Sequence, residues 1–197
     1  MAIKVAFIGA GSIGKQIAQK ARAFHMHIIG IKRHPDIKSK EFDEIHGREA
    51  LENCLARADH VALALPGNPE TDHIIGAAQF KAMKPTAYIY NVGRGNSIDE
   101  NALADALKRG TIAGAGLDVF EREPLPMETP LRHFDNIILS PHASAIAPIY
   151  LDLAMKEFVQ NIERYLSGKK LLHIVSKEKI KRTLDRKKEY SRLDTNV

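Results

Sequence analysis

Short apolar runs alternate along the chain with longer segments of helical periodicity. We expect six strands, at Ile3–Ile8, His27–Ile31, His60–Leu65, Ala87–Asn91, Ala113–Val119 and Asn136–Leu139. We expect five helices, at Ile13–Phe24, Arg48–Arg57, Ala77–Met83, Glu100–Arg109 and Pro148–Leu166. Strands that alternate with helices predict a parallel sheet covered by its crossover helices. The predicted fold class is therefore α/β, a doubly wound, Rossmann-type parallel sheet.

The first predicted helix carries a single apolar stripe. Ile13, Ile17, Ala21 and Phe24 recur at spacings of four, four and three residues, which is the period of one helix face. Ser12 stands directly before this stripe, and its hydroxyl is of the type that caps a helix start. The pattern thus predicts a helix that begins just after a glycine-rich turn.

That turn reads IGAGSIG and places Gly9, Gly11 and Gly14 in the pattern G-x-G-x-x-G. Between a strand and a helix, the first glycine allows a sharp turn and the second lets the backbone approach a pyrophosphate. The third allows close packing of the helix, whose free N–H groups attract phosphate. We expect a dinucleotide to bind here, with Ser12 and Ile13 contributing contacts.

The end of the second strand carries cations. Lys32, Arg33 and His34 follow Ile31, whereas NAD-binding sequences usually have an acid there that binds the ribose 2′-hydroxyl. A carboxylate repels a 2′-phosphate, and Lys and Arg pair with one. The residues favour NADP(H) as the cofactor and leave NAD(H) possible. The alternative is that both cations merely cover a surface loop.

Length and charge suggest one domain with a basic appendage. The chain has 197 residues and a net charge of +5, and segment 177–197 holds eight Lys/Arg against four Asp/Glu, or +4 of that total. We expect a dinucleotide-binding domain at residues 1–176 and a basic tail at 177–197. Because the rest is nearly neutral, nucleic acid is not an expected partner. The tail has two interpretations: it is a solvated helix end, or it is a contact surface for an acidic partner.

Other features exclude several classes of protein. No apolar run approaches the roughly 20 residues of a membrane span, and no signal peptide precedes the first strand. Cys54 is the single cysteine, which rules out an internal disulfide and fits a reducing compartment. The nine histidines show no metal-ligand spacing. We expect a cytoplasmic protein that has no membrane partner and no metal.

Three stretches follow the later strands, namely NVGRG (91–95), LDVFEREP (117–124) and SPHAS (140–144). They place Arg94, Glu123 and His142 at the carboxyl edge of the sheet, where open α/β sheets bind ligands. Arg binds a carboxylate or a polarised carbonyl, His transfers protons, and Glu orients the imidazole. Singly, each could be structural: a strand cap, a solvated carboxylate or a hydrogen-bonded imidazole. Together they predict acid–base chemistry.

These motifs resemble the nucleotide-binding domain of the D-isomer-specific 2-hydroxyacid dehydrogenases. That family includes glyoxylate/hydroxypyruvate reductases and D-3-phosphoglycerate dehydrogenase. The resemblance extends over about residues 3 to 175. The stretches that carry it are LPGNPETDHIIG, MKPTAYIYNVGRGNSIDENALADALKRGTIAGAGLDVFEREPLP and NIILSPHAS.

The resemblance implies a role for each matching residue. Arg94 would bind the 2-oxo acid, His142 would supply the proton and Glu123 would support His142. Asp118 would contact the nicotinamide carboxamide. The remaining matches would line the cofactor cleft: Pro66, Thr71, Val92, Gly93, Arg94, His142 and Ser144.

The resemblance also implies an activity, which is NADP(H)-dependent reduction of a small 2-oxo acid such as glyoxylate or hydroxypyruvate, by a homodimer. Family members carry a second, substrate-binding domain built largely from the chain ahead of this fold. Met1 lies two residues before the first strand, so we expect that separate substrate domain to be missing and the chain alone to be weakly active. The alternative is a non-catalytic dinucleotide-sensing or partner-binding module of the same descent.

Overall fold

The structure, a computed structural model, describes residues 2–35 and 39–175. The chain forms two compact units, residues 1–144 and 145–197. Among the described residues, the first unit contains all the strands, and the second contains helix α5 (Tyr150–Leu166). The boundary expected at residue 176 stays a prediction, because the basic segment 177–197 lies outside the described residues.

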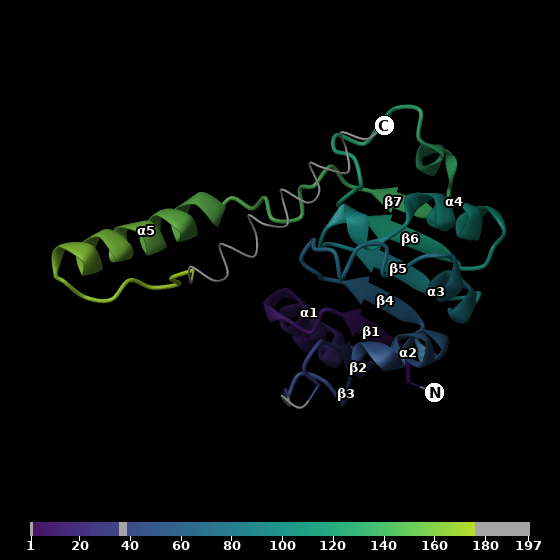
Figure 1. The fold of residues 1–197 in the computed structure, drawn as a ribbon, viewed down its shortest axis with the longest axis horizontal. Coiled ribbons are helices and arrows are strands. Elements are labelled where there is room, and N and C mark those ends of the chain that lie inside the picture. The colour runs from purple at the N-terminus through teal and green to yellow at the C-terminus, as the bar shows by residue number, and fades with distance from the viewer. Residues whose placement is uncertain (1, 36–38, 176–197) are drawn as a thin grey trace. The chain divides into compact units, whose positions relative to one another are not determined.

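The first unit is built on one sheet of seven strands (Figure 1). These are β1 (Lys4–Ile8), β2 (His27–Ile31), β3 (Glu44–His46), β4 (His60–Leu63), β5 (Tyr88–Asn91), β6 (Gly114–Leu117) and β7 (Ile137–Leu139). Their order is β3-β2-β1-β4-β5-β6-β7, and every pairing is parallel. This order is that of a doubly wound Rossmann sheet, so the predicted fold class is confirmed.

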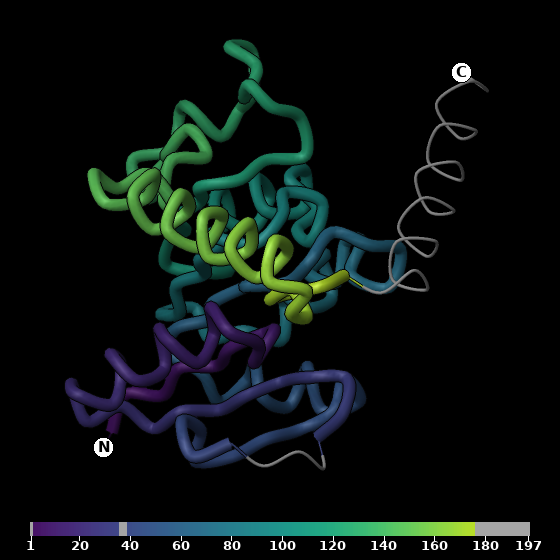
Figure 2. The backbone as a smooth tube through the Cα atoms, turned by 90° about the vertical axis from the view of Figure 1, so that its left-hand side faces the viewer, coloured from purple at the N-terminus to yellow at the C-terminus, as the bar shows by residue number. Residues whose placement is uncertain are grey.

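The sequence did not predict strand β3. Its three residues, Glu44–His46, contain one aliphatic side chain, Ile45, so no apolar run marks them. The strand stands at the edge of the sheet and pairs with β2, with Ile29 opposite Glu44. In Figure 2 the described residues on either side of residues 36–38, namely 32–35 and 39–43, are coloured blue to purple. Backbone hydrogen bonding to β2, rather than burial of a run, makes this segment a strand.

Helices cover both faces of the sheet (Figure 1). Helix α1 (Ser12–Ala23) lies on one face, and the opposite face carries α2 (Leu51–Arg57), α3 (Ala77–Ala82) and α4 (Glu100–Lys108). Short 3-10 turns lie at Arg48–Ala50, Gly95–Ser97 and Pro130–His133. Because strand side chains alternate between faces, Val5 and Phe7 of β1 join the α1 side, whereas Ala6 and Ile8 join the other.

The larger apolar cluster lies under α2, α3 and α4. Leu55, Phe80 and Leu103 each contribute one fully buried side chain to it, one from each helix. Burial of a side chain of this size stabilises the fold by about 1.5–3 kcal/mol. This cluster makes the sheet a rigid platform for the loops that leave its edge.

Helix α1 (Ser12–Ala23) contacts the sheet through small residues. Its buried residues are Gly14 and Ala18, which allow a close approach to β1. The predicted apolar stripe is correct at its two middle residues, Ile17 and Ala21. Both pack against a second, smaller apolar cluster, on the α1 side of the sheet. The stripe is wrong at its ends, because Ile13 and Phe24 are 55% and 76% exposed. The buried side of α1 is set by Gly14 and Ala18, which lie roughly 100° or more around the helix from Ile13, and Phe24 is the C-cap residue beyond the last helical turn.

The second unit consists, as far as residue 175, of α5 and the turn that ends it. Gly168 has φ +65°, a left-handed conformation that suits glycine. After the turn, the amide of Leu172 donates to Asn161 Oδ1 at 2.8 Å, and Arg164 Nε donates to the Lys170 carbonyl at 2.6 Å. Through residue 175, leaving aside 36–38, no helix has both the length and the apolar character that a bilayer crossing requires.

Candidate dinucleotide and acid–base site

The loops that carry the predicted site residues all leave one edge of the sheet. They follow β1, β2, β4, β5, β6 and β7 directly in sequence. Because the strands are parallel, their carboxyl ends point the same way. The strand order reverses between β1 and β4, which is where sheets of this kind bind ligands. The fold therefore gathers these residues at the edge where a ligand is expected.

The three glycines after β1 differ in what surrounds them. Gly9 has φ +100°, and a Cβ there would lie 2.6 Å from the Ala64 carbonyl oxygen. A Cβ on Gly14 would lie 2.4 Å from the Gly9 carbonyl oxygen. A Cβ on Gly11 would meet nothing within 4 Å. Packing thus requires the outer two glycines, and the middle one faces open space.

This open space adjoins the start of α1. Gly11 is the N-cap residue and Ser12 is the first helical residue, with no side-chain cap, so the expectation that Ser12 caps the helix is wrong. The first turn also contains no acidic residue. Its amide groups and the positive end of the helix dipole therefore suit an anion. Gly11 and these amides fit the pyrophosphate of a dinucleotide.

The cations predicted to select the cofactor lie at the end of β2. The amide of Lys32 donates to the His46 carbonyl at 3.0 Å, which ties this point to the end of β3. The guanidinium of Arg33 forms an ion pair with Glu70, from the loop after β4. His34 is exposed. The structure thus places all three directly after the carboxyl end of β2, with a carboxylate beside Arg33; their contact with a cofactor stays a prediction.

The loop after β4 is held in shape by its own hydrogen bonds. The Thr71 hydroxyl donates to the Pro66 carbonyl at 2.7 Å and accepts from the Asn68 amide at 3.1 Å. Asn68 Oδ1 in turn accepts from the Glu70 amide at 3.0 Å. Asn68 and Thr71 are both buried. Thr71 therefore shapes the loop, and its contact with a cofactor stays a prediction, as does that of Pro66.

The last residue of β5, Asn91, organises the turn that carries Arg94. Asn91 is 1% exposed; its Nδ2 donates to the Arg94 carbonyl at 3.0 Å, and its Oδ1 accepts from the Gly93 amide at 3.0 Å. A Cβ on Gly93 would lie 2.7 Å from the Leu65 amide, so this turn packs on the loop after β4. Val92 is partly buried within it. Sequence reasoning missed Asn91, although a polar residue that ends a buried strand is a usable signal.

Arg94 is exposed at the tip of this turn. Its Nη1 donates to the Gly93 carbonyl at 2.6 Å. A Cβ on Gly67 would lie 3.3 Å from Arg94 Cγ, so the side-chain stem runs along the loop after β4. The guanidinium is also close enough to Glu123 to lower the pKa of that carboxylate. The structure therefore brings Arg94 towards the residues that follow β6.

His142 and Glu123 are in direct contact. His142 Nδ1 lies 2.7 Å from Glu123 Oε2, and Glu123 Oε1 accepts from the Phe120 amide at 3.0 Å. Burial acts to raise the pKa of Glu123, but these hydrogen bonds and the neighbouring positive charges together lower it. With Nδ1–H donated to a carboxylate, the imidazole is oriented and its Nε2 is left for other chemistry.

The backbone at His142 is unusual, with φ +54° in the left-handed region that favours glycine. Its amide donates to the Ser140 carbonyl at 3.0 Å. A non-glycine residue held in this conformation costs free energy, and such residues cluster at functional sites. The loop conformation thus gives His142 a defined position beside Glu123.

Asp118, at the end of β6, holds the loop of His142. Its Oδ1 accepts from the Ser140 hydroxyl at 2.7 Å and from the Ala143 amide at 2.8 Å, and its Oδ2 accepts from the Ser144 amide at 3.0 Å. Asp118 is 5% exposed. Burial acts to raise its pKa, but the hydrogen bonds from Ser144, Ser140 and Ala143 lower it to about 2. The expected contact of Asp118 with the nicotinamide stays a prediction.

We expect the Asp118→Asn variant to lose about 2 kcal/mol of unfolding free energy at pH 7, because an amide cannot accept every one of these bonds. The pKa is depressed from 3.8 to about 2. The stabilisation is therefore complete above about pH 4 and decreases as the pH falls towards 2. Urea unfolding between pH 7 and pH 3 measures it. A stability gap between wild type and variant that stays constant with pH would contradict this account.

Over the described ranges, 2–35 and 39–175, no group of three or more His, Cys, Asp or Glu side chains is arranged to hold a metal ion. The polar groups at the sheet edge instead pair with one another, as in the contacts of Glu123 and Asp118 above.

Comparison with known proteins agrees with this arrangement. A family model described as the D-isomer specific 2-hydroxyacid dehydrogenase NAD binding domain matches residues 2–144. The glyoxylate reductase of Aeropyrum pernix is 40% identical over 177 residues, or 88% of this chain and 52% of that protein. Glyoxylate/hydroxypyruvate reductase B of Pectobacterium carotovorum is 40% identical over 167 residues, or 83% and 51%. The chain spans about half the length of these relatives.

A solved structure shares the fold. The D-isomer specific 2-hydroxyacid dehydrogenase of Xanthobacter autotrophicus, crystallised with NADPH, has a TM-score of 0.79 and 36% identity, covering 88% of this chain and 71% of that one. The order of strands, the glycine turn and the His–Glu pair thus occur in a chain that matches this family over most of its length. The chain belongs to the D-isomer specific 2-hydroxyacid dehydrogenase family and contains its NAD binding domain.

Proposed function

We propose that this chain supplies the cofactor-binding and acid–base part of an oxidoreductase. The reaction is hydride transfer between NADP(H) and C2 of a small 2-oxo or 2-hydroxy acid, of the glyoxylate or hydroxypyruvate type. The observation that carries the proposal is the contact of His142 with Glu123 at the sheet edge that also holds the glycine turn. The names of the glyoxylate reductase relatives support the substrate class.

Each residue has a definable task in this reaction. Glu123 accepts the Nδ1 proton of His142 in a hydrogen bond, so His142 Nε2 is the atom that gives a proton to the substrate oxygen or takes one from it. Arg94 is a planar cation suited to a carboxylate or a developing alkoxide. Asp118 keeps the His142 loop in place. The nicotinamide supplies or accepts the hydride when the cofactor is bound.

The cofactor we propose is NADP(H). Support comes from Lys32 and Arg33 at the end of β2, where a carboxylate would oppose a 2′-phosphate. The neighbour from Xanthobacter autotrophicus that was crystallised with NADPH is consistent with this choice. The glycine turn and the uncapped start of α1 hold the pyrophosphate in either cofactor.

We expect NADPH to bind more tightly than NADH, and the difference to shrink as salt rises because ion pairs with phosphate are screened. Replacing both Lys32 and Arg33 with alanine should remove most of the preference, about 1–3 kcal/mol for charge-assisted contacts. Titration followed by nicotinamide fluorescence measures both constants. Tighter binding of NADH by the unmodified chain would overturn the choice of NADP(H).

Turnover by the chain alone is proposed to be weak. The side chains of His142 and Glu123 are 47% and 35% exposed, and hydride transfer is favoured when water is excluded. We expect slow oxidation of NADPH by glyoxylate with this chain, and faster oxidation when the remaining segment of a glyoxylate reductase relative is fused to it. Cofactor binding without turnover in either form would favour the dinucleotide-sensing alternative. The proposal includes a homodimer, which sedimentation analysis tests.

A further inference from the structure

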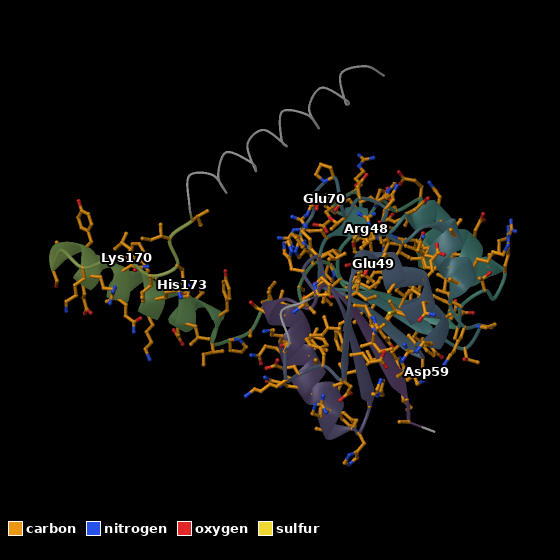
Figure 3. The ribbon with its side chains drawn as sticks, turned by 60° about the horizontal axis from the view of Figure 1, so that its bottom comes forward. Arg48, Glu49, Asp59, Glu70, Lys170 and His173 are labelled. Atoms are coloured by element: carbon orange, nitrogen blue, oxygen red, sulfur yellow. The ribbon has the colours of Figure 1, made fainter. Side chains whose placement is uncertain are left out.

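Glu70 lies among cations at the ribose end of the proposed cofactor site. Its carboxylate forms an ion pair with Arg33, at the end of β2. Its backbone carbonyl accepts a hydrogen bond of 2.6 Å from Arg48 Nη1, in the turn after β3. Figure 3 shows Glu70 and Arg48 close together, with Asp59 farther away. One residue of the loop after β4 is thus attached to the ends of two other strands.

The backbone of Glu70 is firmly placed. Its amide donates to Asn68 Oδ1 at 3.0 Å, and Asn68 and Thr71 on either side of it are buried, at 5% and 8% exposure. The side chains of Glu70 and Arg33 are 56% and 57% exposed. A fixed backbone with an exposed carboxylate holds the charge near Arg33 while leaving the pair open to a competing anion.

We propose that Glu70 sets the cofactor preference by competing with the 2′-phosphate for Arg33. This inference rests on the proposed binding of NADP(H) at this edge. A 2′-phosphate that pairs with Nη2 of Arg33 has to displace the Glu70 carboxylate from that atom, and the cost of breaking this ion pair is subtracted from the affinity for the phosphate. A dinucleotide with a free 2′-hydroxyl leaves the Arg33–Glu70 pair intact.

Glu70 therefore lowers the affinity for NADPH and leaves that for NADH nearly unchanged. Lys32 and Arg33 favour NADPH over NADH, and Glu70 reduces this difference in affinity. Because the pair is more than half exposed, the effect is moderate and depends on salt. The cofactor preference of this chain is then the balance of two opposing charges, and substitution of one residue shifts it.

The Glu70→Gln variant tests this inference by titration with NADPH and NADH, followed by nicotinamide fluorescence. Gln keeps the size of the side chain, and the loop is held by backbone contacts that the change does not remove. We expect NADPH to bind roughly three- to tenfold more tightly at low salt, with a smaller gain at high salt. The dissociation constant for NADH should change by less than about twofold.

Glu49→Gln is the matched control, because it removes one carboxylate in the turn beside Arg48 and leaves the Arg33–Glu70 pair in place. We expect this control to change NADPH affinity by less than about twofold. An equal gain from both variants, or an equal gain for both cofactors in Glu70→Gln, would overturn the inference in favour of general charge.

A double-mutant cycle with Arg33→Ala separates competition from simple repulsion. In the Arg33→Ala background, Glu70→Gln should improve NADPH binding by much less than in the wild type. An undiminished gain would overturn the competition. Failure of the wild type to bind either cofactor refutes the proposed function itself. Binding by the wild type with no response to Glu70→Gln refutes only the role of Glu70.

Discussion

Replacement of His142 by alanine is expected to lower kcat for glyoxylate reduction by about 10²–10⁴-fold, the usual contribution of a positioned general acid. The reason is geometric. His142 Nδ1 lies 2.7 Å from Glu123 Oε2, so the ring is oriented with Nε2 available to the substrate. Alanine removes the only group here that we assign to proton transfer. The measurement is the rate of NADPH oxidation by glyoxylate, with this chain fused to the remaining segment of a glyoxylate reductase relative.

His73→Ala is a matched control for this experiment. His73 also pairs with a carboxylate, with Nε2 2.9 Å from Glu121 Oε1, and it also has a positive φ, of 41°. Its side chain is 49% exposed, close to the 47% of His142. We expect His73→Ala to keep kcat within about threefold of wild type, as for a surface substitution. A kcat insensitive to His142→Ala would contradict the assigned proton transfer.

The second large effect is expected from Gly11→Asp, which should weaken NADPH binding by at least about 100-fold. A Cβ at Gly11 meets nothing within 4 Å, so the protein itself tolerates a side chain there. The carboxylate would instead occupy the space proposed for the pyrophosphate, and like charges brought together cost several kcal/mol. Thermal unfolding of the variant should remain close to that of wild type.

Gly14→Ala is the informative contrast. Its Cβ would lie 2.4 Å from the Gly9 carbonyl oxygen, so we expect a loss of stability of about 1–3 kcal/mol from overpacking. Fluorescence titration and thermal unfolding of both variants separate the two roles. Unchanged NADPH binding by Gly11→Asp would show that no pyrophosphate lies above the turn.

Local patterns were sufficient for much of the fold. Six apolar runs at regular intervals predicted six of the seven strands, because a buried parallel strand must be apolar on both faces. The glycine turn was readable because Gly9 requires a positive φ and Gly14 a close contact, both of which are demands on the residue type itself. The carboxyl-edge position of Arg94, Glu123 and His142 followed from their places directly after strands.

Other features depended on contacts between segments distant in sequence. Strand β3 exists because its backbone pairs with β2, and Asn91 matters because the turn of Arg94 folds back onto it. The exposed ends of the predicted α1 stripe, Ile13 and Phe24, show the same limit. Periodicity indicates which face of a helix is apolar, whereas the neighbouring elements decide how much of that face is covered.

The sequence by itself thus determined six of the seven strands, the glycine turn and the residue types at the edge of the sheet, because each is encoded in short patterns of burial and backbone freedom. Only the tertiary structure decided which charges meet. From the sequence, Arg33 was expected to pair with a 2′-phosphate, whereas in the structure the loop after β4 places Glu70 beside it. Asp118 turned both carboxylate oxygens towards the His142 loop. Such pairings depend on loop conformations, which are set by hydrogen bonds that no local pattern records.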